Sequence, residues 1–111
     1  MVALLRKVIA AAPALDSGGP HRVLALVLLR APGWPMGPGD PEAALDEARA
    51  AARLFPGAAE NQLALAEALG KNGSPDGARA AYQRALDLAT AAAGDPDAER
   101  WRAEASAGVN R

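Results

Sequence analysis

The feature that most constrains the fold is a pair of apolar-periodic segments within residues 59–89, separated by a short run of turn residues. In each segment the apolar residues recur at i, i+3, i+4 and i+7, a spacing that places them on one face of an α-helix. Gly70 and Gly73 supply stop signals, and Ser74 followed by Pro75 is typical of an N-cap and a first-turn proline. The stretch therefore predicts a helical hairpin. Its predicted core positions are Gln62, Leu65, Ala66 and Leu69 in the first helix, and Ala78, Ala81, Tyr82, Ala85 and Leu88 in the second.

The preceding residues repeat this plan, which indicates a repeat architecture. Second-helix residues match 34 positions apart: Ala44 with Ala78, Ala48 with Tyr82, Ala51 with Ala85. First-helix residues match 41 positions apart: Leu24-Ala25 and Leu28 with Leu65-Ala66 and Leu69. A first hairpin whose loop, residues 32–40, is longer by seven residues explains both offsets.

These residues resemble the tetratricopeptide repeat family. The family places a small residue after a leucine in the first helix, a large residue three positions later, and then alanine, aromatic and alanine in the second helix. Leu65-Ala66, Leu69, Ala78, Tyr82 and Ala85 fit that pattern, and Pro56 fits the proline that ends a repeat, whereas Gln62 and Ala48 stand where the family often has an aromatic residue.

The resemblance implies an all-α fold in which antiparallel helical hairpins stack as a short right-handed α-solenoid of about six helices. Residues 1–15 would form a half repeat or an N-terminal helix. Residues 19–58 would form a repeat with its loop lengthened at 32–40. Residues 59–92 would form the second repeat, and residues 95–108 a capping helix.

A second resemblance concerns residues 18–48, GGPHRVLALVLLRAPGWPMGPGDPEAALDEA. This stretch is similar to periplasmic tetratricopeptide proteins associated with TRAP-type solute transporters. It implies an alternative function as an accessory component of such a transport system, or as a module of an oligomeric assembly. The chain alone favours the cytoplasm, and a secretion signal upstream would make the protein periplasmic.

Composition excludes several classes of partner. The formal charge of −1 arises from interspersed acids and bases, so there is no basic field for nucleic acid. No apolar run approaches the ~20 residues of a membrane span, so we expect no membrane insertion. Arg6 and Lys7 interrupt the N-terminal apolar stretch, which favours an amphipathic helix over a signal peptide. That helix would place Leu4, Leu5, Val8, Ile9 and Ala12 on one face.

Residues for catalysis are scarce. His21 is the only histidine, cysteine is absent, and serine occurs only at Ser17, Ser74 and Ser106. The chain therefore offers almost no residues from which a nucleophile, a base and an orienting group could be assembled. We expect a non-catalytic protein without cofactor or metal, in which His21 opens a helix for structural reasons.

The outward faces of the two first helices are the candidate binding surface, because first helices line the concave groove of a repeat solenoid. In that reading Leu26, Leu29 and Leu63 form an apolar floor, and Arg22, Arg30 and Lys71 hold carboxylates of a protein or peptide partner. The alternative is that the N-terminal helix or the proline loop covers Leu26 and Leu29. The candidate groove residues are Arg22, Leu26, Leu29, Arg30, Glu60, Leu63, Glu67 and Lys71.

The loop at 32–40 offers a further candidate in Trp34 and Met36. An exposed tryptophan on a proline-stiffened loop would be a binding anchor. We expect instead that Trp34 docks onto its own hairpin as a plug, because burying it stabilises an ordered loop by ~2 to 3 kcal/mol.

A repeat stack needs about three units with covered ends. The half unit at the start leaves one face of the N-terminal helix without a neighbour. We therefore expect either a homodimer or a longer solenoid that continues through this helix.

Overall fold

Six α-helices make up the described part of the chain, residues 2–11 and 19–111 of a computed structural model. They are α1 (Val2–Ala11), α2 (Gly19–Arg30), α3 (Pro41–Leu54), α4 (Ala59–Lys71), α5 (Pro75–Ala91) and α6 (Ala98–Val109). The prediction of an all-α chain is confirmed for these residues, where the only β-type pairing is an isolated bridge between Gly33 and Gly39. None of the six helices is long and apolar enough to cross a membrane.

Short-range signals set the helix ends. The side chain of Asp40 accepts a hydrogen bond from the amide of Ala43 at 3.1 Å, and α3 begins at the next residue, Pro41. Gly73 has a φ of 81°, a left-handed conformation that glycine adopts without strain, and it separates α4 from α5. The last helix begins at Ala98, a few residues after the predicted start, because the Asp95 side chain accepts from the amide of Asp97 and holds a turn there.

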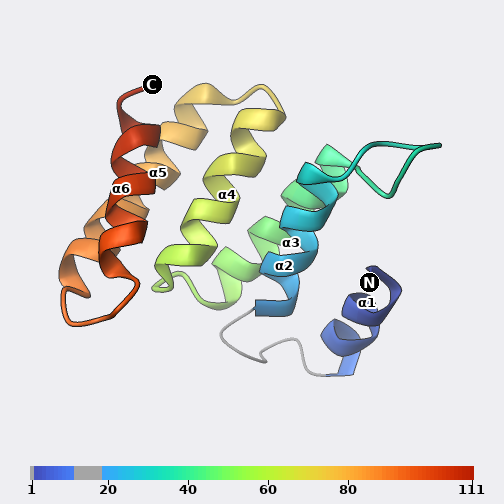
Figure 1. The fold of residues 1–111 in the computed structure, drawn as a ribbon, viewed down its shortest axis with the longest axis horizontal. Coiled ribbons are helices and arrows are strands. Elements are labelled where there is room, and N and C mark those ends of the chain that lie inside the picture. The colour runs from blue at the N-terminus through green and yellow to red at the C-terminus, as the bar shows by residue number, and fades with distance from the viewer. Residues whose placement is uncertain (1, 12–18) are drawn as a thin grey trace.

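The helices are arranged in chain order, each packed against the next (Figure 1). In addition, α4 contacts both α2 and α6, so these three helices form one row. Every second helix therefore lies in one layer, formed by α2, α4 and α6, and α3 and α5 pack behind that layer. This arrangement places the outward faces of α2, α4 and α6 side by side.

Alanine makes up much of the core, in two clusters. The first joins α2, α3 and α4, and its fully buried residues are Leu24, Ala25, Ala44, Ala48 and Ala68. The second joins α4, α5 and α6 around Tyr82. Small side chains allow close approach of the helices, which suits a chain with 4 % aromatic residues. Most predicted core positions of α5 are buried, although Ala89 takes the buried place that we expected for Leu88.

Two buried amide side chains fix the turn between α3 and α4. Asn61 donates to the carbonyl oxygens of Ala51 and Phe55, at 3.2 and 3.3 Å, and Gln62 donates to the carbonyl of Pro56 at 3.1 Å. Asn61 is fully buried and Gln62 is 4 % exposed. Gln62 replaces the aromatic residue of the resembled pattern, and its amide ties down the turn that precedes α4.

The N-terminal helix packs through most of the predicted face, since Leu5, Val8 and Ile9 are partly buried, with Leu4 as the exception. Val2, Leu5 and Ile9 contact the first core cluster, whereas Leu4 is 66 % exposed. The expectation that Leu4 shares the buried face is wrong, because the neighbour α2 contacts the i, i+3, i+7 stripe that begins at Val2. Ala12, also assigned to that face, lies outside the described residues.

Candidate functional site

A groove runs over the outward faces of α2, α4 and α6. One part of it is a cavity of about 210 Å³, with Leu26, Leu63 and Trp101 among its walls. Charged residues from all three helices surround these apolar groups. They are Arg22 and Arg30 from α2, Glu60 and Glu67 from α4, and Arg100 and Glu104 from α6.

A second cavity of about 310 Å³ continues the groove toward the N-terminal end of α4. The two cavities share Arg22, Glu60 and Trp101, so they adjoin each other at these residues. The other walls of the second cavity come from residues 57–59, from Leu88 on α5 and from Asp95. We call this combined depression the interhelix groove.

The charges of the interhelix groove are largely paired within the chain. Arg30 makes a bidentate ion pair with Glu67, at 2.7 and 3.1 Å, which joins α2 to α4. Arg22 donates to Asn61 at 2.8 Å and lies 4.0 Å from Glu60. The hydrogen bonds that Arg30 donates to Glu67, together with the negative charges of Glu67 and Glu104, raise the pKa of Arg30. Arg30 and Arg22 therefore already face carboxylates of their own chain, and the groove carries charges of both signs.

Trp101 forms part of the wall that both cavities share. Its ring packs against the second core cluster, while its indole Nε1 is buried and has no hydrogen-bond partner among the described residues. A buried donor without an acceptor costs about 1 to 3 kcal/mol. Trp101 is therefore held in place by packing of its ring.

Six of the eight predicted groove residues come together in the interhelix groove: Arg22, Leu26, Arg30, Glu60, Leu63 and Glu67. Leu29 does not line either cavity; it is buried in the first core cluster, between α2, α3 and α4. Leu26 lines the groove, so neither the N-terminal helix nor the loop at 32–40 covers both leucines as the alternative required. Lys71 lies one turn past Glu67 and lines a separate pocket.

Sequence reasoning did not place α6 in the groove. Arg100, Trp101 and Glu104 fall at i, i+1 and i+4, which puts them on one helical face, and that spacing was the available signal. The role expected for residues 95–108 is only that of a capping helix. Its second role follows from the row formed by α2, α4 and α6, which pattern reasoning on α6 alone does not reveal.

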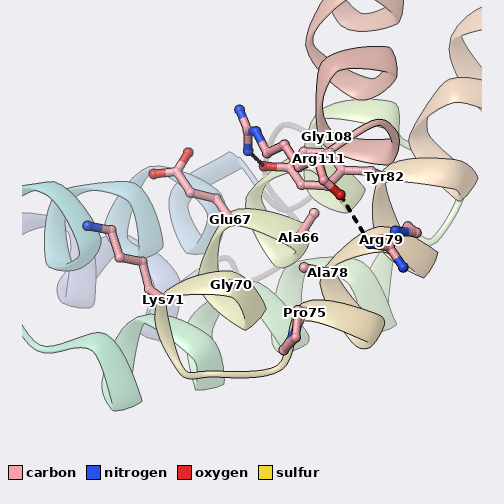
Figure 2. Close-up of a pocket in the computed structure, with 10 residues that line it drawn as sticks. All are labelled: Ala66, Glu67, Gly70, Lys71, Pro75, Ala78, Arg79, Tyr82, Gly108 and Arg111. Atoms are coloured by element: carbon pink, nitrogen blue, oxygen red, sulfur yellow. Dashed lines mark hydrogen bonds between the residues drawn. The ribbon is translucent and has the colours of Figure 1, made fainter.

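The separate pocket lies where α4, α5 and the end of α6 meet, and it has a volume of about 400 Å³ (Figure 2). We call it the terminal pocket. Small residues and one ring form its apolar part, namely Ala66, Gly70, Ala78 and Tyr82. Around it stand the cationic residues Lys71, Arg79 and Arg111, together with Glu67.

Arg111 lies over the ring of Tyr82, 5.6 Å from the ring centre, and donates to the Tyr82 hydroxyl at 3.3 Å. Arg79 donates to the backbone carbonyl of Arg111 at 3.1 Å. Gly108 permits this arrangement, since a Cβ there would lie 2.3 Å from the Tyr82 ring. These contacts hold the end of the chain at the pocket's edge.

The loop at 32–40 does not form the predicted plug. Trp34 is 89 % exposed and Met36 is 83 % exposed, so both side chains project into solvent. The backbone of the loop is nevertheless well bonded: Met36 donates to Gly33, Gly39 to Pro32, and Asp40 to Leu28. A Cβ at Gly39 would lie 2.2 Å from the carbonyl oxygen of Ala31, so the base of the loop closes too tightly for docking of its tip onto the hairpin.

Two of the residues considered for catalysis, His21 and Ser74, take structural positions, whereas Ser17 lies outside the described residues. Nδ1 of His21 lies 2.6 Å from a carboxylate oxygen of Glu47, a pair that joins α2 to α3, and Arg6 of α1 lies 3.9 Å from the same carboxylate. Ser74 occupies the N-cap position of α5. Within residues 2–11 and 19–111, no three histidine or acidic side chains gather as metal ligands.

Comparison with known proteins adds no family to these observations: no protein-family model matches the chain, and no curated protein matches it closely enough to count as a relative.

Proposed function

We propose that this protein is a non-catalytic interaction scaffold of tetratricopeptide-like construction, which binds an extended peptide or a partner helix in the interhelix groove. The observation that carries the proposal is the groove itself. It crosses three helices, combines two cavities that share residues, and has apolar walls together with seven charged side chains.

The architecture supports this proposal. In stacked helical hairpins, the first helix of each pair lines the concave surface, and α2, α4 and α6 occupy those places in the row. Stacked repeats commonly use such surfaces to receive extended segments or helices. We therefore assign α2 with α3 and α4 with α5 to two repeats, and α6 to the cap.

The charge balance of the groove defines the ligand class. Arg30 and Glu67 are already paired, so a purely acidic or purely basic ligand would meet like charges on one side of the groove. A peptide can instead place apolar side chains against Leu26 and Trp101 and carry both acidic and basic residues between them. Its charges then face groove residues of the opposite charge. We propose that such a mixed-charge amphipathic segment is the ligand.

The test is selection of a random peptide library displayed on phage, followed by fluorescence anisotropy on the enriched peptides. Arg100→Glu, in the groove wall, should weaken their binding about tenfold or more. Arg102→Glu is the matched control, since Arg102 makes the same charge change on the same helix and does not line the groove. Failure to enrich any peptide above scrambled sequences, or equal losses in both variants, would refute the proposal.

A further inference from the structure

The exposed tip of the loop at 32–40 and the terminal pocket are features that the proposed function does not use. Trp34 and Met36 are two of the most exposed large apolar side chains among the described residues. They sit on a loop whose backbone hydrogen bonds hold it in one shape, so the tip loses little conformational freedom on binding. A rigidly presented tryptophan is a typical energetic anchor of a protein interface.

The terminal pocket matches this tip in size and chemistry. At about 400 Å³ it falls within the range of pockets that enclose one or two large side chains. Its apolar part offers Tyr82 and small side chains for ring packing, and its cations Lys71 and Arg111 are placed for contact with an indole face. The base of the loop is acidic, with Asp40 and Glu42, which complements the cationic edge of the pocket.

The loop tip and the terminal pocket lie on different sides of the molecule. The loop projects from the α2 and α3 side of the molecule, away from α5 and α6, whereas the terminal pocket lies at the side of α5, α6 and the C-terminus (Figure 1). The loop therefore points away from the pocket of its own chain. The tip can therefore meet such a pocket only on another copy of the chain.

We infer that the tip formed by Trp34 and Met36 inserts into the terminal pocket of a second copy of this chain. The contact is heterologous, because a knob on one copy meets a socket elsewhere on the next. It continues from copy to copy as a head-to-tail chain. This interface differs from the predicted homodimer through the N-terminal helix, since α1 takes no part in it.

A heterologous contact permits a complementation test by sedimentation velocity, at concentrations from about 5 µM to 1 mM, a range suited to a weak interface with one aromatic anchor. Trp34→Ser removes the tip. Gly70→Leu fills the pocket, and a Cβ at Gly70 would meet only the Cβ of Ala78, at an ordinary 3.9 Å, so this variant is expected to fold. Circular dichroism melting checks that it does.

The wild type is expected to grow in mass with concentration, whereas each variant alone stays monomeric. An equimolar mixture of the two variants should form a dimer and nothing larger, because only one intact tip and one intact pocket remain. In that mixture the Trp34 emission of the Gly70→Leu chain should shift to shorter wavelength as the tip enters the pocket.

Leu4→Ser is the control for a contact through α1, since Leu4 is also exposed and apolar. It should leave self-association unchanged. Loss of association in Leu4→Ser would overturn the inference, as would a wild type that stays monomeric at the highest concentration. A mixture of the two variants that remains monomeric would overturn it too. Self-association of Gly70→Leu alone would also overturn it, because a symmetric tip-to-tip contact gives that result.

Discussion

Replacing Asn61 by alanine should be among the most damaging single changes in this chain. Asn61 is fully buried and accepts a hydrogen bond from the guanidinium of Arg22 at 2.8 Å. A bond to a charged partner contributes about 1.5 to 3 kcal/mol. Its two amide donations, to Ala51 and Phe55, are long at 3.2 and 3.3 Å, and we assign each about 0.5 kcal/mol.

Neither carbonyl oxygen would be stranded by the change, since Ala51 also accepts from the amide of Phe55, and Phe55 from the amide of Ala58. The expected loss is therefore the sum of the three bonds, about 3 kcal/mol in the free energy of unfolding. For 111 residues the entropy of unfolding is about 0.23 kcal/mol/K, so the melting temperature should fall by about 13 °C.

The assay is urea unfolding followed by circular dichroism, with Gln83→Ala as control because Gln83 makes one exposed hydrogen bond, to Asp87. The control should cost less than about 0.5 kcal/mol. When Arg22 has already been replaced by leucine, the loss on changing Asn61 should shrink by more than about 1 kcal/mol, since the two residues are coupled. A loss for Asn61→Ala no larger than that of the control would refute the reasoning.

Two further changes test close packing around α6. Gly108→Ala should destabilise the chain by about 1 to 3 kcal/mol, because the new Cβ would lie 2.3 Å from the Tyr82 ring. Gly94→Ala is the control and should cost little, because a Cβ there meets nothing within 4 Å. Equal melting temperatures for the two variants would contradict this prediction. Trp101→Phe should cost less than about 1 kcal/mol in urea unfolding, because loss of packing is offset by removal of the unpaired buried Nε1–H. A cost above about 2 kcal/mol for that change would indicate that the indole nitrogen contributes to stability.

Local signals made the helices predictable. Both ends of α3, Pro41–Leu54, are marked in the sequence, because a capping aspartate with a following proline begins the helix and Pro56 with Gly57 comes shortly after its end. The hairpin at 59–89 is likewise formed by α4 and α5, separated at Gly73. Caps, prolines and glycines act through the backbone of a few neighbouring residues, so a sequence displays them directly.

The groove was predictable only in part, because local signals do not show which helices pack against each other. Periodicity identifies which residues share a helical face, and it brought Arg22, Leu26 and Arg30 together correctly. It does not say which neighbouring helix covers a face, so Leu29 entered the core and Leu4 remained exposed against expectation.

The sequence by itself determined where the helices lie and that the core is built from alanine and leucine. Only the tertiary structure decided that α6 joins α2 and α4 in one row, that the groove's arginines are paired with carboxylates, and that Trp34 points into solvent. The physical reason is range: helix formation depends on residues within a few positions of each other, whereas burial and ion pairing join residues that are distant in the chain, such as Arg30 and Glu67.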